Sequence, residues 1–288
     1  MRFSVFGFLP LLVVGASAHA ATLSIGPSGA QPGDILTVTI TPTGGEKITG
    51  VGMKAFDTDQ VKFYTRSDGS VRAFLGYPFD RKGGTFPLAA RVQTDKGEQT
   101  LNYNFRGRTR DYPTQHITMR NSATAAKMDQ KDALRQEKIF VQSKMKNSYA
   151  APLWKGNWIV PCKGAATSAY GRRRYVNGKW WGQHNGADVK AGTGTPIKAA
   201  NSGRVVLSAY LPLLRGNCVV VDHGCNVFSI YMHMSKREVS EGQSVGKGQE
   251  LGKVGATGFV TGAHLHWEVR VGWEPVDPNH VVAHGLSF

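Results

Sequence analysis

The sequence predicts a mainly β protein of two domains joined by a charged helical linker. Three observations carry this prediction: short β-branched segments over residues 21–119, helical spacing among charged residues over 120–151, and a return of β-rich segments over 152–288. A chain of 288 residues is long for one compact domain and sufficient for two. With 41% hydrophobic and 19% charged residues, the chain has the composition of a folded protein.

The first twenty residues have the pattern of a secretory signal peptide. Arg2 supplies a positive charge, residues 3–14 form an apolar run, and Ala18-His19-Ala20 offers a cleavage motif of small residues. The apolar run is shorter than the ~20 residues of a membrane-spanning helix, which disfavours an uncleaved anchor. We therefore expect cleavage after Ala20, a periplasmic or secreted protein, and no membrane span in the remaining chain.

Residues 21–119 have the texture of short strands separated by turns. His116 is the only histidine of this part, which contains no catalytic constellation. Several short strands at this spacing predict a small β-sandwich of the immunoglobulin-like type. The clearest strand segments are Ile35–Ile40, Val51–Phe56 and Phe86–Val92, and the clearest turns are Gln31–Asp34 and Arg81–Gly84.

The segment 120–151 changes from strand to helix spacing. Leu134, Val141 and Met145 recur at helical intervals among charged residues, and Ser122 or Thr124 would cap the helix. This pattern predicts a charged, amphipathic linker helix. A helical arm packed against either domain is the alternative.

Residues 152–288 predict a β-dominated domain with long glycine-rich loops and no long apolar helix. The β-rich segments are Gly203–Leu207, Cys218–Val221 and Val227–Tyr231. This part also holds all three cysteines, Cys162, Cys218 and Cys225, in a chain expected to be exported. At most one disulfide can form within the chain, and the sequence does not choose among the three pairings.

Histidines with unusually specific spacing lie in the second domain. His264 and His266 are two apart, so on a strand both side chains point to one face while Leu265 turns away. His184 and Asp188 would share a face in the same way if both lie on extended backbone. Two imidazoles and one carboxylate form a three-ligand set that leaves a fourth Zn²⁺ position open for water, and further histidines remain to move protons and hold an oxyanion.

At these residues the sequence resembles the M23, or lysostaphin/LytM, family of zinc metallopeptidases. The H-x-x-x-D of His184–Asp188 and the H-x-H of His264–His266 match the family's signature pair. The resemblance runs from about Trp154 to Pro278, and the front half is weakly similar to a Gram-negative branch of this family. Further matching segments are Gly194–Ala199, Val221–Gly224, Tyr231–Ser235 and Gly255–Gly258.

The resemblance implies a LytM-type catalytic domain and a role for each site residue. His184, Asp188 and His266 would bind one zinc ion per chain. His233 and His264 would flank the metal-bound water as general base and oxyanion stabiliser, in an order that the sequence leaves open. Those five residues are the complete set of site residues that we predict.

A few residues depart from the family pattern or stand beside the motifs. Ala187, Ala263 and Met234 replace the Val, Pro and Leu that the family commonly has, which affects loop geometry and substrate fit but removes no functional side chain. His223, before a glycine turn, is interpreted as structural or as a support of the site. Trp180 and Trp181 line a groove or pack internally, and His280 and His284 lie outside the site.

The resemblance also implies an activity, which is hydrolysis of peptide cross-links in peptidoglycan, with D-alanyl–diaminopimelate bonds favoured over glycine bridges. The alternative is a non-enzymatic regulator of cell-wall amidases, although every ligand position is filled here. A peptidase acting on proteins would use identical residues, and a pure wall-binding module would not need them. The two peptidase alternatives differ only in their substrate, which the sequence does not reveal.

The charge of the chain agrees with an acidic polymer as partner. The formal net charge is +15, of which Arg2 would leave with the signal peptide, and a basic surface attracts polyanions. Export and the lack of a nucleic-acid-binding signature exclude nucleic acid as the partner. Peptidoglycan carries free carboxylates and lies outside the cytoplasmic membrane, so we expect it to be the partner.

Overall fold

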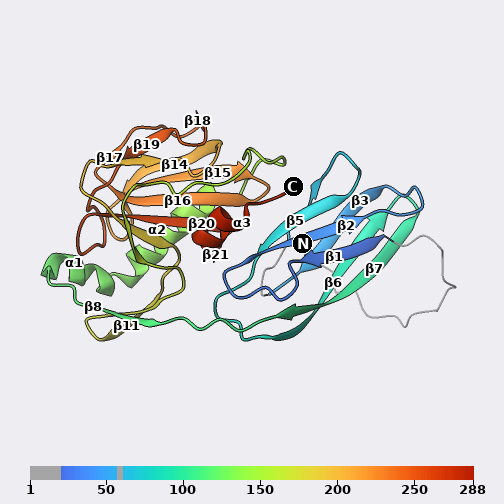
Figure 1. Ribbon diagram of the computed structural model, residues 1–288, viewed down its shortest axis with the longest axis horizontal. Coiled ribbons are helices and arrows are strands. Elements are labelled where there is room, and N and C mark those ends of the chain that lie inside the picture. Colours follow the sequence, from blue (N-terminus) through green and yellow to red (C-terminus); the bar gives the residue numbers. More distant parts are fainter. Residues whose placement is uncertain (1–20, 57–60) are drawn as a thin grey trace, which may run out of the picture.

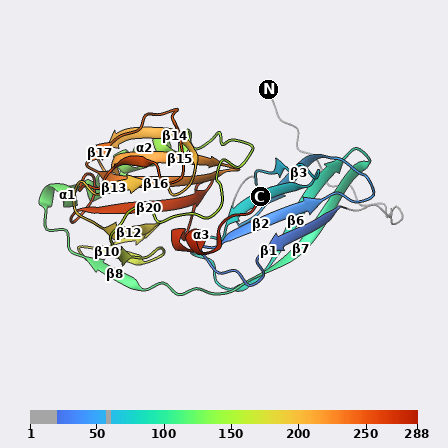
Figure 2. The ribbon, with the colours of Figure 1, turned by 45° about the horizontal axis from the view of Figure 1, so that its top comes forward.

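The computed structural model describes residues 21–56 and 61–288, and the predicted signal peptide lies outside these residues. Figure 1 shows two β-rich bodies side by side, the first in blue to green and the second in yellow to red. A long green segment runs from the first body beneath the second, and Figure 2 shows the same course from another angle. In the described ranges, no helix is long and apolar enough to cross a membrane.

The first body consists of two antiparallel sheets. One has the strand order β1-β2-β5-β4 and the other the order β3-β6-β7. The segment predicted over Phe86–Val92 is the middle of the eleven-residue strand β6, and the segment predicted over Val51–Phe56 begins earlier, at Ile48. The strands are β1 Thr22–Gly26, β2 Ile35–Thr41, β3 Ile48–Lys54, β4 Tyr64–Thr65, β5 Val71–Gly76, β6 Gly84–Thr94 and β7 Gly97–Gly107.

Alternating side chains explain why the two sheets pack together. In β2, Leu36, Val38 and Ile40 are fully buried while the residues between them are more exposed, and Ala90 and Val92 repeat this pattern in β6. Inward-facing residues of both sheets belong to one hydrophobic cluster. The first body is therefore a two-sheet sandwich, and its immunoglobulin-like type stays a prediction.

The segment between the bodies is only partly helical. It contains β8 (Thr114–Ile117), α1 (Ser122–Ala126), a 3₁₀ turn (Lys127–Asp129) and α2 (Lys131–Lys144). The cap of α1 is Asn121, whose side chain accepts a hydrogen bond from the backbone of Thr124, and not Ser122 or Thr124 as the sequence suggested. On α2, Val141 packs with Met145 against β14 to β16, so this arm is docked on the second body.

The second body is built on a sheet with the strand order β18-β14-β15-β16-β20-β12-β9, with β21 paired to β20. Two three-stranded sheets, β13-β19-β17 and β11-β10-β8, flank it. The mainly β domain that the sequence predicts is thus confirmed. Its elements are β9 Ala165–Ser168, β10 Arg173–Val176, β11 Lys179–Gln183, β12 Ala187–Lys190, β13 Pro196–Lys198, β14 Gly203–Leu211, β15 Gly216–Gly224, β16 Val227–Met234, β17 Lys236–Arg237, β18 Ser244–Val245, β19 Glu250–Lys253, β20 His264–Val271, β21 Glu274–Val276 and α3 Pro278–His284.

The central strands are apolar on both faces because both faces are covered. In β15, Val219 and Val221 belong to the larger cluster of the second body, whereas Cys218 and Val220 belong to the cluster beneath α2. A strand buried on both sides appears as a continuous apolar run in the sequence, as Cys218–Val221 does. Strands β12, β16 and β20 of this sheet carry four of the five predicted site residues, which are Asp188, His233, His264 and His266.

The two bodies share an interface with an apolar part and a polar part. Phe74 packs edge-on against Trp154, with ring centroids 5.7 Å apart. Nearby, Arg110 and Asp277 form a salt bridge of 2.6 Å, and the backbone N–H of Asp277 donates to the carbonyl of Gly33. Residues from both bodies thus enter one hydrophobic cluster.

The three cysteines are all free and buried. The one disulfide that the sequence allows is therefore not formed. Burial raises the pKa of the Cys218 thiol to about 12, which keeps it a neutral, packed side chain. The cysteines thus contribute to the core and not to a covalent crosslink.

Candidate metal centre

Strand β20 brings the H-x-H histidines to the middle of the sheet. His266 lies opposite Asp188 of β12 on one side and Met232 of β16 on the other. His264 and His266 lie toward the same groove, whereas Leu265 is fully buried in the hydrophobic core. This is the alternation that the two-residue spacing predicts.

His184 also lies beside Asp188 and His266, but not on an extended strand shared with Asp188 as the sequence suggested. Asp188 lies on β12, but His184 lies in the connection between β11 and β12, so the two do not share one extended strand. The bend at Gly186 turns the chain. A Cβ added at Gly186 would lie 2.2 Å from the carbonyl oxygen of Trp267, so the connection passes directly against β20.

This close approach leads to a prediction about Gly186→Ala. The added methyl group must push the His184–Asp188 connection away from β20, and overpacking of this kind typically costs ~1–3 kcal/mol. We expect the free energy of unfolding, measured with denaturant, to fall by about that amount. Gly246→Ala is the matched control, because a Cβ there would meet open space and the φ of Gly246 lies outside the left-handed region. Equal stability of the Gly186→Ala variant and the unchanged chain would contradict the packing described here.

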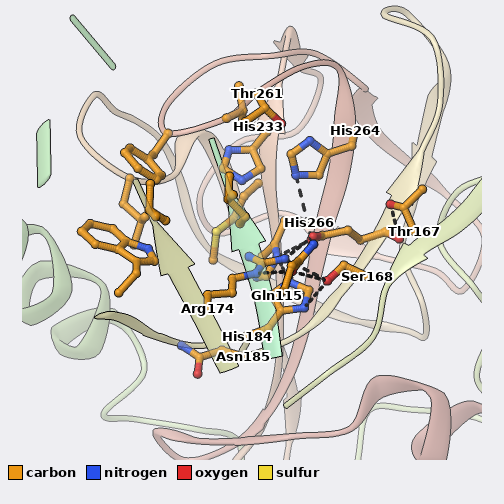
Figure 3. A pocket seen from close by; sticks show the side chains of 18 of the residues that line it. Gln115, Thr167, Ser168, Arg174, His184, Asn185, His233, Thr261, His264 and His266 are labelled. Atoms are coloured by element: carbon orange, nitrogen blue, oxygen red, sulfur yellow. Dashed lines mark hydrogen bonds and ion pairs between the residues drawn. The ribbon is translucent and has the colours of Figure 1, made fainter. Parts of the chain in front are cut away.

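Three side-chain atoms converge at the base of the site (Figure 3). The Nε2 atom of His184 lies 2.9 Å from Oδ1 of Asp188 and 2.9 Å from Nδ1 of His266. The distance from His266 Nδ1 to Asp188 Oδ1 is 2.7 Å. All three residues are buried, and together they form a group that could hold a metal ion.

Hydrogen bonds on the outer side of each ring fix which nitrogen faces inward. Nδ1 of His184 lies 2.8 Å from the carbonyl oxygen of Ala169, and Nε2 of His266 lies 3.0 Å from the carboxylate of Glu268. A carbonyl oxygen and an ionised carboxylate accept hydrogen bonds and do not donate them, so these ring nitrogens carry the protons. The inward nitrogens then present lone pairs, as metal-ligating histidines do. The donor set therefore fits a divalent cation.

The charges around the three residues also favour a cation. Burial opposes ionisation of Asp188, yet the adjacent imidazoles of His184 and His266 hold the pKa of its carboxyl well below the usual value. Burial lowers the pKa of His184 to about 4. His266 behaves oppositely, because the carboxylates of Asp188 and Glu268 outweigh burial and raise its pKa. The two carboxylates thus favour a positive charge at this point, which a proton or a metal ion supplies.

His233 and His264 lie above this group, with ring centroids 4.9 Å apart (Figure 3). Nδ1 of His233 lies 2.9 Å from the carbonyl of Thr257, and Nδ1 of His264 lies 2.9 Å from that of Gly262. Nδ1 is therefore the donor in both rings, which leaves each Nε2 to accept a proton. Burial lowers the pKa of both imidazoles, most strongly for His233, so both are neutral at pH 7.

The backbone of His233 adds a further sign of function. Its φ is +64°, in the left-handed region that a non-glycine residue rarely occupies. Such a conformation costs about 1–3 kcal/mol and persists where the surroundings enforce it, often at functional sites. Here the backbone N–H of His233 donates to the carbonyl of Arg215, which holds the strained residue in place.

All five predicted site residues line one groove of about 520 Å³. Trp181 lines this groove and also stacks on Phe259, with ring centroids 4.9 Å apart. Both roles expected from the sequence, lining a groove and packing against another side chain, therefore apply to Trp181. Trp180 is 56% exposed and lines a neighbouring hollow, and Trp181 lies in the lining of both this hollow and the groove. The aromatic pair thus borders the site from the β10–β11 hairpin.

The remaining histidines of the second body lie apart from the groove. His223 is fully buried, with Nδ1 2.8 Å from the carbonyl of Ser202 and Nε2 2.7 Å from the hydroxyl of Ser229, which fits its interpretation as structural. His280 and His284 stack on each other on α3. His280 also lies 3.1 Å from the carboxylate of Asp34.

Several residues that support the site were not among the predicted site residues. Glu268 had a local signal, because it lies two residues after His266 and so faces the same side of β20. Arg174, which contacts Asp188, and Glu137 on α2 gave none. Glu137 contacts residues 76 to 78 positions away, and Arg174 reaches Asp188 14 positions away across a turn and a bent connection, so no periodicity encodes either pair.

Glu137 holds the turn that supports His233. Its buried carboxylate accepts hydrogen bonds from the backbone N–H groups of Leu213, Leu214 and Arg215 and from the Arg215 guanidinium, at 2.9 to 3.3 Å. The same Arg215 supplies the carbonyl that binds His233 N–H. A residue of the linker helix thereby supports one wall of the groove.

We predict that Glu137→Gln destabilises the chain. The substitution leaves the 4%-exposed guanidinium of Arg215 without its counter-charge, and breaking a buried ion pair typically costs about 3–5 kcal/mol. The midpoint of denaturant unfolding should fall accordingly. Glu98→Gln, which removes a carboxylate from a surface pair with Arg91, is the matched control and should change little. Similar midpoints for the two variants would show that Glu137 does not anchor the turn.

A buried two-histidine, one-carboxylate group beneath two neutral histidines, in a groove, is the arrangement of a metallopeptidase. Comparison of the sequence with known protein families agrees with this class, because residues 182–278 match the model of Peptidase family M23. This part of the chain is an M23 peptidase domain. The match contains all five predicted site residues.

Named relatives share this domain. The chain is 44% identical over 94 residues to "Peptidoglycan DD-endopeptidase ShyA" of Vibrio cholerae, covering 33% of this chain and 22% of the relative. It is 36% identical over 112 residues to "DD-carboxypeptidase/endopeptidase Mpg" of Neisseria meningitidis, covering 39% and 26%. The similarity thus spans about a quarter of these relatives' length, and it concerns the domain that holds the site.

A solved structure resembles nearly the whole chain. The crystal structure of a Pseudomonas aeruginosa protein assigned to peptidase M23 aligns with a TM-score of 0.60 and 25% identity. The alignment covers 88% of this chain and 96% of the other. The fold likeness therefore extends beyond the M23 domain to the part before it.

Proposed function

We propose that this protein is a zinc-dependent endopeptidase that hydrolyses peptide cross-links of peptidoglycan. The observation that carries the proposal is the convergence of His184, Asp188 and His266, with the outer nitrogen of each ring held by an acceptor. Nitrogen and carboxylate donors in a three-residue set suit zinc and leave a position for water. Bound there, zinc would polarise a peptide carbonyl and make water nucleophilic at neutral pH.

The five site residues are proposed to have two kinds of role, metal binding and proton transfer. His184, Asp188 and His266 would hold the cation, the last two from the paired strands β12 and β20 and the first from the connection before β12. Nε2 of either His233 or His264 is placed to take a proton from the attacking water as general base, and the other ring would donate to the developing oxyanion once its own Nε2 carries a proton. Which of the two is the general base stays open.

The substrate is proposed from the relatives and from charge. The names of relatives from Vibrio cholerae and Neisseria meningitidis include peptidoglycan DD-endopeptidase and DD-carboxypeptidase/endopeptidase. A net charge of +15 suits a polymer rich in carboxylates. We therefore propose D-alanyl–diaminopimelate cross-links as the scissile bonds and, with the signal peptide expected over residues 1–20, action in the periplasm or outside the cell.

A non-enzymatic regulator of amidases is the second candidate. The complete ligand set and the two additional histidines argue against it, because binding alone requires neither. A peptidase that acts on proteins would use the same site. The two enzymatic candidates are distinguished by substrate.

The test is mass spectrometry of muropeptides after purified sacculi are incubated with the protein, with and without a zinc chelator. We expect cross-linked dimers to be converted to monomers, and the chelator to stop the conversion. Unchanged dimers from a zinc-loaded protein, together with activation of an added amidase, would establish the regulator instead. Unchanged dimers together with cleavage of a protein would show that the enzyme acts on proteins and not on peptidoglycan.

A further inference from the structure

The metal centre contains a contact from outside the M23 match. Strand β8 (Thr114–Ile117) follows the first body in the chain, yet it pairs in parallel with β10 of the second body. In this register Gln115 lies beside Arg174. Figure 3 shows both side chains directed toward the ligand group.

Hydrogen bonds connect Gln115 to a proposed metal ligand in two steps. The Gln115 side-chain oxygen accepts from Nε of Arg174 at 3.0 Å and from the hydroxyl of Ser168 at 3.2 Å. Nη2 of Arg174 donates to Oδ2 of Asp188 at 2.6 Å and to the Ser168 hydroxyl at 3.0 Å. Asp188 thus uses Oδ2 for the guanidinium and directs Oδ1 toward His184 and His266.

We propose that Gln115 is a positioning residue of this metal centre, acting through Arg174 on Asp188. The inference rests on the proposed function. It means that the segment between the two bodies completes the site, although it lies outside the M23 match. Gln115 is not a metal ligand in this scheme, since its described side-chain contacts are with Arg174 and Ser168.

Geometry explains why the Gln115 contact matters. A guanidinium is planar, so fixing Nε and Nη2 at once fixes its orientation. Without the acceptor on Nε, Arg174 can rotate about its flexible stem, and Asp188 loses the fixed partner of Oδ2. Residues that orient metal ligands typically contribute 10–100-fold to metal affinity.

A role confined to strand pairing is the rival explanation. β8 is held to β10 through backbone pairing over four residues, which a change of the Gln115 side chain leaves intact. If Gln115 has only a structural role, changing its side chain would lower the stability of the chain and leave zinc affinity unchanged. If Gln115 is a positioning residue, the same change would lower zinc affinity.

The experiment measures zinc affinity of the full metal-free chain by competition with a chromogenic chelator, and the melting temperature beside it. Gln115→Met removes the acceptor while keeping side-chain length, and we expect zinc to bind about tenfold more weakly. Gln115→Glu keeps an acceptor oxygen and should bind zinc nearly as the unchanged chain does. Gln136→Met, at an exposed position of α2, is the matched control.

A double variant tests the two-step connection. If Gln115 acts through Arg174, then Gln115→Met should weaken zinc binding little further in an Arg174→Met background. Should Gln115→Met fail to fold, Arg174→Lys breaks the same link, because lysine keeps a charge for Asp188 but lacks the guanidinium fork that also reaches Gln115. The same loss of affinity is then expected.

Unchanged affinity in Gln115→Met, or in Arg174→Lys, would overturn the proposal, and so would independent losses in the double variant. These measurements need no substrate. A chain that binds zinc as expected but cleaves no peptidoglycan would therefore contradict the proposed function and leave the role of Gln115 supported.

Discussion

Replacing His184 or His266 by alanine is expected to abolish zinc binding and hydrolysis together. Each substitution removes one of three converging donors, and the two that remain do not hold the ion in place. Zinc content per chain, measured by elemental analysis after exhaustive dialysis, should fall from about one to near zero. Hydrolysis of cross-linked muropeptides should fall to the level of the chelated protein.

The matched control for these variants is His284→Ala. This histidine is exposed at the end of α3, does not line the groove, and its described contacts are with His280 of the same helix. It should keep both zinc and activity. Zinc retained by folded His184→Ala at the level of His284→Ala would remove His184 from the ligand set.

Replacing His233 or His264 by alanine is expected to spare the metal and suppress the rate. Neither ring nitrogen takes part in the three-atom convergence, so zinc content should stay near one per chain. Loss of a group that moves a proton or holds an oxyanion typically lowers kcat by about 10²–10⁴. The rate and the zinc content are measured on the same preparations.

The two groups of variants separate ligands from proton-handling residues. If His264→Ala loses zinc as completely as His266→Ala, His264 is a ligand and the division is wrong. Near-native turnover by His233→Ala would likewise remove His233 from the chemistry. The enzyme class would survive either result, because it depends on the ligand set as a whole.

Local periodicity predicted the parts of the site that lie on regular strands. The H-x-H spacing placed His264 and His266 on one face, since β20 is a continuous strand. The same argument was incomplete for His184, because the chain bends at Gly186 and the residue lies before β12. The structure does bring His184 and Asp188 together, as the M23 resemblance implies, although a shared strand is not the reason for their convergence.

Contacts between distant segments could not be predicted in this way. Gln115 and Arg174 are 59 residues apart, and Glu137 and Arg215 are 78 apart. Such pairs arise from how β8 and α2 dock on the second body, and docking leaves no periodic pattern in either segment. The helical linker was predicted as an element, but its contribution to the groove became visible only in the folded chain.

The most direct test of the central claim is a titration of the metal-free protein with zinc while cleavage of a purified cross-linked muropeptide is followed. The account predicts no cleavage before zinc is added, a linear rise, and a plateau at about one equivalent per chain. Full cleavage by the metal-free protein, unchanged by added zinc, would contradict it.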